Sequence, residues 1–126
     1  MNALTFWTGA DPKVITRVIG RSLRSFRPNV PEHRFIEYGE SKPMPEPAAG
    51  EVVVVCGDRC LDVLRRAGIV AKNRTVNAMR EVPIKRGDGW YLVSYDPSIT
   101  DREPEKTEII DWDVRLAHRL HCKHAA

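Results

Sequence analysis

Four consecutive valines, at positions 52–55, constrain the fold of this chain more than any other feature of its sequence. The strand that they predict, Glu51–Cys56, is apolar on both faces, and such strands belong to parallel sheets that are covered on both sides. Gly57 ends the strand, and Arg59–Ala67 has the apolar spacing of a helix that stops at Gly68. We therefore expect a central parallel strand that leads directly into a helix.

The other regular segments alternate between strand and helix along the chain. We expect strands at Leu4–Thr8, His33–Tyr38 and Trp90–Tyr95, and helices over residues 12–26 and near Asp111–His121. Residues 39–50 have the composition of an exposed connection, and residues 69–86 have no firm assignment. The alternation predicts a single α/β domain, a three-layer α/β/α sandwich around a small, mainly parallel sheet.

Length and composition narrow the class of protein. The 126 residues suit one domain, and the longest apolar run, Val52–Cys56, is too short to span a bilayer. The N-terminus has no secretory signal pattern, and three cysteines without a CxxC pair fit a reducing compartment. We therefore expect a cytoplasmic protein without membrane contact, in which the three cysteines, Cys56, Cys60 and Cys122, are buried, inert thiols.

The carboxyl ends of three predicted strands carry the residues on which we expect chemistry. Open α/β sheets bind ligands beyond these ends, and the free N–H groups of a helix N-terminus favour phosphate. Asp11 and Asp58 have a second interpretation, as side chains that only cap their helices. The three segments are Gly9-Ala10-Asp11-Pro12, Cys56-Gly57-Asp58-Arg59 and Asp96-Pro97-Ser98.

Basic residues gather in the first predicted helix. The formal net charge is only +3, but residues 13–27 contain five basic side chains and no acidic one. Helical spacing places Arg17, Arg21 and Arg24 on one exposed stripe, which Lys85 and Arg86 are expected to extend. Such a stripe is typical of contact with a DNA backbone, although it also fits a charged face that only keeps the protein soluble.

The C-terminal segment has histidines and a cysteine near metal-ligand spacing. Imidazole and thiolate suit zinc, and His118, His121 and Cys122 would share a helix face, with His124 close by. No second ligand pair supports a closed zinc site, and histidines near a helix C-terminus also complement its dipole. We therefore predict no metal and no cofactor.

Three motifs in order give the chain a family resemblance. They are Gly9-x-x-Pro12 after a strand, Val-Val-Val-Val-Cys-Gly-Asp-Arg-Cys-Leu-Asp-Val-Leu from Val52, and Tyr-Leu-Val-Ser-Tyr-Asp-Pro-Ser from Tyr91. Together with Ile109–Ala117 they resemble the uracil-DNA glycosylase superfamily, most closely its bacterial and phage branches. The resemblance covers most of the chain and implies a trimmed glycosylase-like fold.

The resemblance also implies which positions matter. In that family an acidic residue in the first loop helps water attack the sugar, and a histidine before Pro-Ser stabilises charge on the departing uracil. Here Ala10 takes the acidic position, Asp11 is one place late, and Asp96 replaces the histidine, while Pro97 and Ser98 match. An ionised Asp96 would repel the charge that the histidine stabilises.

Three functions therefore compete. The first is a non-catalytic glycosylase-like module, in a bacterial or phage-infected cell, that binds DNA and/or a replication protein such as a phage DNA polymerase. The second is an active, divergent uracil-DNA glycosylase that uses Asp11 and Asp96, and the third is a protein-interaction domain without DNA binding. The expected substrate- or DNA-binding residues are Gly9, Ala10, Pro12, Pro97, Ser98, Arg17, Arg21, Arg24, Lys85 and Arg86.

Overall fold

The computed structural model describes residues 2–124 and contains one five-stranded sheet. The strand order is β2-β1-β3-β5-β4, and every neighbouring pair is parallel except β4 with β5. The strands are β1 (Leu4–Thr8), β2 (His33–Glu37), β3 (Val52–Cys56), β4 (Ile84–Arg86) and β5 (Gly89–Ser94). The α/β fold with a mainly parallel sheet is therefore confirmed.

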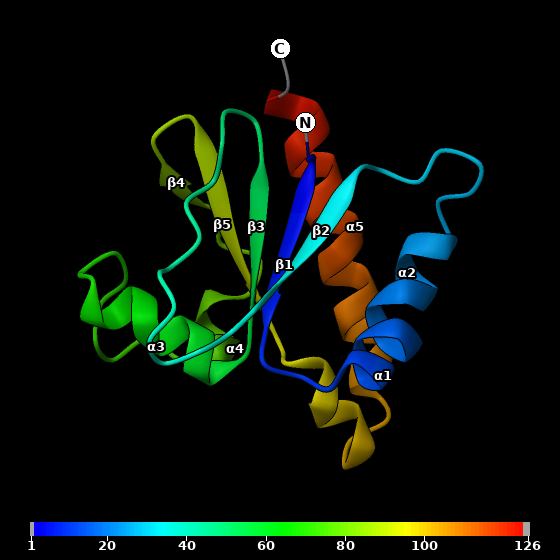
Figure 1. The fold of residues 1–126 in the computed structure, drawn as a ribbon, viewed down its shortest axis with the longest axis horizontal. Coiled ribbons are helices and arrows are strands. Elements are labelled where there is room, and N and C mark those ends of the chain that lie inside the picture. Colours follow the sequence, from blue (N-terminus) through cyan, green and yellow to red (C-terminus); the bar gives the residue numbers. More distant parts are fainter. Residues whose placement is uncertain (1, 125–126) are drawn as a thin grey trace.

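Helices cover both faces of this sheet (Figure 1). On one face lie α1 (Pro12–Ile15), the π-helical η1 (Thr16–Gly20), α2 (Arg21–Arg24) and the long α5 (Lys106–His124). On the other lie α3 (Asp58–Arg66) and α4 (Val76–Met79), and the 3₁₀ helix η2 (Pro97–Asp101) follows β5. No helix within residues 2–124 is both long and apolar enough to cross a membrane.

The central strand β3 has the two-sided burial that its sequence predicts. Val52 and Val54 belong to the core beneath α5 and η1, whereas Val53 and Val55 belong to the core beneath α3. None of the four valines is more than 1% exposed. The neighbours β1 and β5 are also buried almost throughout, although they include the polar residues Thr5, Thr8 and Ser94.

The first helix keeps its predicted start but not its regular form. Asp11 accepts a hydrogen bond from the Lys13 N–H at 2.8 Å and so caps α1. The middle turn, η1, widens into a π-helix, and α2 ends at Arg24 rather than at residue 26. Asp58 is not an N-cap, because Gly57 takes that position at φ +91°, and the Asp58 carboxylate instead pairs with Arg65 at 2.8 Å.

A buried ion pair fixes the segment that sequence patterns left unassigned. Asp113 of α5 is 1% exposed and accepts two hydrogen bonds from Arg80, at 2.7 and 2.9 Å, and one from Ser94 at 2.6 Å. Arg80 follows α4 directly and bridges to Val93 of β5. Because the carboxylate has three donors, its burial is compensated, and residues 76–86 are held against the sheet.

The burial of β3 predicts that Val54→Asp abolishes folding. An unpaired carboxylate in the core costs several kcal/mol, which approaches the whole ~5–15 kcal/mol stability of a typical domain. Circular dichroism and thermal melting of the purified variant measure this loss.

Val82→Asp is the matched control, because Val82 is 44% exposed. The same substitution there should change the free energy of unfolding by less than ~0.5 kcal/mol. A Val54→Asp protein with a native spectrum and an unchanged melting temperature would contradict the central placement of β3.

Candidate functional site

The order of the strands creates a crevice between β1 and β3. The chain leaves β1 toward β2 on one side and leaves β3 toward β5 on the other, and ligands bind at such switch points in open α/β sheets. A cleft of about 180 Å³ occupies this position, which we call the carboxyl-end cleft. It is lined by Gly9, Cys56, Gly57, Asp58, Arg59, Cys60, Asp96 and Ser98. The three strand ends singled out in the sequence therefore meet at one site.

Two glycines let the side chains of this cleft approach closely. A Cβ on Gly57 would lie 2.7 Å from the Cβ of Asp96, and the φ of +91° also favours glycine at this position. A Cβ on Gly9 would lie 2.7 Å from Nη2 of Arg59. The strand-end glycines thus leave space that Asp96 and Arg59 fill.

Asp96 is held by hydrogen bonds on both of its carboxylate oxygens. Thr8 Oγ1 donates to Oδ1 at 2.8 Å, while the N–H of Ser98 donates to Oδ2 at 3.1 Å and the Ser98 hydroxyl donates to the same oxygen. Asp96 is in this way the N-cap of η2, with Pro97 buried as the first residue of that helix. The Asp96 carboxylate is therefore engaged in local structure.

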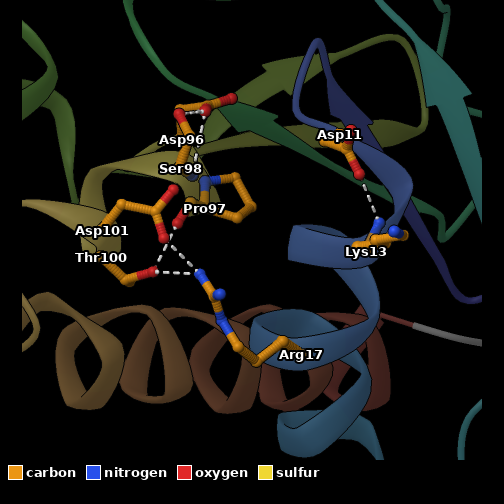
Figure 2. Close-up of polar contacts among 8 residues, drawn as sticks. All are labelled: Asp11, Lys13, Arg17, Asp96, Pro97, Ser98, Thr100 and Asp101. Carbon is orange, nitrogen blue, oxygen red and sulfur yellow. Dashed lines mark hydrogen bonds and ion pairs between the residues drawn. The ribbon is translucent and has the colours of Figure 1, made fainter.

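Asp11 does not join Asp96 in the cleft. Its exposed side chain turns back to cap α1, on a different element from Asp96 (Figure 2). Ala10 and Pro12 line a separate groove between the first helix and β2. Of the first motif, only Gly9 reaches the carboxyl-end cleft.

The basic stripe is less free than its sequence predicts. Arg17, Arg21 and Arg24 are exposed, but Arg17 pairs with Asp101 of η2 at 2.6 Å and also donates to Thr100 (Figure 2). The prediction that all three arginines lack a counter-charge is therefore wrong for Arg17. The partner comes from a position 84 residues away, which local patterns do not reveal.

Lys85 and Arg86 do not extend the stripe. They lie on β4, at the edge of the sheet opposite β2, while the stripe lies on the first helix beside β2 (Figure 1). Arg86 makes two hydrogen bonds to Glu46, at 3.0 and 3.1 Å, and the Lys85 ammonium lies 5.9 Å from the centre of the Trp90 ring. These two residues are part of the β4 edge rather than of the site.

Two arginines lie beside the cleft: Arg59, which belongs to a segment singled out in the sequence, and Arg102, which sequence reasoning missed. The Arg59 guanidinium lies over the Tyr38 ring at 5.3 Å, and Arg102 lines a neighbouring hollow of about 360 Å³. That hollow shares Gly57, Asp58, Asp96 and Ser98 with the carboxyl-end cleft. Among residues 2–124, neither arginine has a carboxylate within 4 Å. Arg102 directly follows η2, and that position was the available signal for it.

The two cysteines beside the cleft are protonated packing groups. Burial, followed by the nearby Asp96 carboxylate, raises the pKa of Cys60 to about 12, and burial also raises the pKa of Cys56 well above its usual value. Cys122 differs from the prediction of buried thiols, because it is exposed on α5, where its Sγ lies 3.4 Å from Nε2 of His118.

The histidines near the end of α5 point to different places. His121 Nδ1 lies 2.6 Å from the Gly50 carbonyl oxygen, the His124 ring packs on Trp90, and the His118 ring packs edge-on against Phe26. Within residues 2–124, no three His, Cys, Asp or Glu side chains are grouped as metal ligands.

Comparisons with protein-family models, with curated proteins and with solved structures gave no match to this chain. The resemblance to the uracil-DNA glycosylase superfamily therefore stays a prediction that rests on the quoted motifs.

The thiol environments predict a simple labelling pattern. In the native protein at pH 8, Ellman's reagent should react quickly with Cys122 alone, because Cys56 and Cys60 are buried and their raised pKa values keep them protonated. In denaturant all three should react. A Cys122→Ser variant should show no fast phase, and rapid native labelling of that variant would contradict the described burial.

Proposed function

We propose that this chain is a DNA-binding module that uses the carboxyl-end cleft and has no normal uracil-DNA glycosylase activity. The observation that carries the proposal is a division of roles at that cleft. The two carboxylates that line the cleft are engaged within the protein, Asp96 as the N-cap of η2 and Asp58 as the partner of Arg65. Arg59 of the cleft and Arg102 of the neighbouring hollow have no carboxylate within 4 Å among residues 2–124.

The absence of uracil excision is supported by the side chains of the cleft. Asp96 accepts hydrogen bonds from Thr8 and Ser98, so it presents an acceptor where glycosylase chemistry needs a donor. Asp11, required by the competing active-glycosylase hypothesis, does not line the cleft.

DNA binding is supported by the cations around the cleft. Guanidinium groups without a protein counter-ion are suited to phosphate, which they can bind through two parallel hydrogen bonds. Gly57 at the N-cap of α3 offers no side-chain acceptor, so no side chain competes for the first N–H groups of that helix. Phosphate contacts of this kind position DNA without selecting its sequence.

A protein partner is the second candidate function. The observation that favours it is the apolar groove beside β2, which contains no catalytic arrangement and lies outside the carboxyl-end cleft. A replication protein, such as a phage DNA polymerase, is the partner class that the sequence resemblance implies.

The first test is uracil release. Purified protein should release no uracil above background from single- or double-stranded uracil-containing DNA, since Asp11 lies outside the cleft and Asp96 is held as an acceptor by Thr8 and Ser98. A known glycosylase run in parallel gives the positive control. Robust release that disappears in Asp96→Ala or Asp11→Ala would establish the active-glycosylase hypothesis instead.

The second test is salt-dependent DNA binding by the cleft-rim arginines, Arg59 and Arg102. Fluorescence anisotropy with a labelled duplex should show affinity that falls as salt rises. The double variant Arg59→Glu/Arg102→Glu should bind more weakly and lower the slope of log K against log salt by about 2.

A matched control for this test is Lys72→Glu/Arg74→Glu, which makes the same change of charge at exposed positions on the loop after α3. It should lower affinity much less than the rim variant. Equal losses in the two double variants would show that net charge, rather than the cleft, governs binding. No binding by the unaltered protein at low salt would overturn the DNA proposal.

A further inference from the structure

The groove between the first helix and β2 is larger and more apolar than the carboxyl-end cleft. We call it the β2 groove; its volume is about 470 Å³, within the range of common binding sites. Its apolar lining includes Ile15, Leu23, Val30 and Phe35. Val30 is 39% and Phe35 43% exposed, so apolar surface faces the solvent here.

The wall of this groove is an open sheet edge. The Tyr38 N–H donates to the Thr8 carbonyl at 2.9 Å, and the Leu4 N–H donates to the Glu32 carbonyl at 3.2 Å. Residues 32, 34, 36 and 38 of this strand segment therefore direct their backbone toward β1. The backbone N–H and C=O groups of residues 33, 35 and 37 point outward, where no strand pairs with β2 within residues 2–124.

The other edge of the sheet shows what a protected edge looks like in this molecule. β4 has three residues, of which Lys85 and Arg86 are charged, and short charged strands discourage pairing with other chains. β2 is longer, and its charged side chains are paired within the molecule, Arg34 with Glu51 at 3.5 Å and Glu37 with Lys42 at 2.8 Å. It places Phe35, stacked on Phe6 at a ring distance of 5.5 Å, on the face toward the groove. The edge beside the apolar groove is therefore the open one.

Charge at the groove selects among possible occupants. Arg24 and Arg27 line it, both are exposed, and neither has a carboxylate within 4 Å among residues 2–124. The acidic residue in the lining, Glu37, is paired with Lys42 at 2.8 Å. An occupant that brings a carboxylate is thus complemented by two arginines.

We propose that the β2 groove docks an extended segment of a partner protein, which adds a strand to β2. Its alternate apolar side chains enter the groove over Phe35, and an acidic side chain meets Arg24 and Arg27. Added strands gain affinity from main-chain hydrogen bonds and specificity from pockets for alternate side chains. This proposal does not depend on DNA binding at the carboxyl-end cleft.

Single-stranded DNA is the less favoured occupant. Such sites present aromatic platforms on which successive bases stack. Phe35 and His33 are the aromatic rings lining this groove; one face of Phe35 is already stacked on Phe6, and the His33 ring lies edge-on to Phe35 at 5.6 Å. The remaining apolar lining is aliphatic, and a polynucleotide makes no ladder of hydrogen bonds with a strand edge.

The test is selection from a library of random dodecapeptides displayed on phage, followed by fluorescence polarisation with the enriched peptides. We expect enriched sequences with apolar residues at alternate positions and at least one Asp or Glu. Arg24→Glu/Arg27→Glu should weaken binding by about tenfold or more, and Val30→Asp should also weaken it. Lys72→Glu/Arg74→Glu, with the same change of charge, should bind as the unaltered protein does. Melting temperatures verify that each variant is folded.

Amide hydrogen exchange measured by NMR tests the strand addition itself. Peptide binding should slow exchange of the outward amides at residues 33, 35 and 37. Unchanged rates there would show that the peptide does not extend the sheet and would overturn that assignment.

Three other results would overturn the proposal. The first is a library that yields no enriched peptides. The second is enriched peptides that bind the Arg24→Glu/Arg27→Glu variant as well as they bind the unaltered protein. The third is oligothymidylate binding that is lost in the Arg24→Glu/Arg27→Glu variant but retained in the cleft-rim variant. Loss of DNA binding in the cleft-rim variant alone bears only on the DNA proposal, so the failure of one proposal is distinguishable from the failure of the other.

Discussion

The parallel pairing of β1 with β3 is the interaction on which the rest of this structure depends. Both strands are buried on both faces, and their register joins Leu4 with Val52 and Phe6 with Val54. Because the two strands run in the same direction, their carboxyl ends lie side by side, and in this strand order the chain leaves β1 toward β2 and β3 toward β5. The position of the cleft, of the first helix and of α3 follows from that one pairing.

Sequence patterns predicted the centre of the molecule better than its periphery. The valines of β3 and the glycines after β1 and β3 have local signatures, because strand burial and tight turns are set by neighbouring residues. The ion pairs of Arg17 with Asp101 and of Arg80 with Asp113 have no local signature, since only the fold brings the two residues of each pair together. The structure of residues 69–86 could not be predicted for the same reason, because the ion pair of Arg80 with Asp113 depends on a residue far away in the sequence.

The candidate site shows the same division. The meeting of Gly9, Gly57 and Asp96 was foreseeable, because parallel strands present their carboxyl ends at one edge. Which carboxylate faces the cleft could not be foreseen, since an aspartate that precedes a helix can also serve as the N-cap of that helix. Asp11 and Asp96 both became caps, and the cations beside the cleft, Arg59 and Arg102, come from positions with no distinctive spacing.

The unequal edges of the sheet have a consequence for assembly. A chain with two open edges can join its neighbours at both and grow into fibres. Here β4 is short and charged, which discourages pairing at that edge, whereas β2 is the longer edge strand. Pairing through this sheet is therefore favoured at one edge, and growth from both edges is disfavoured.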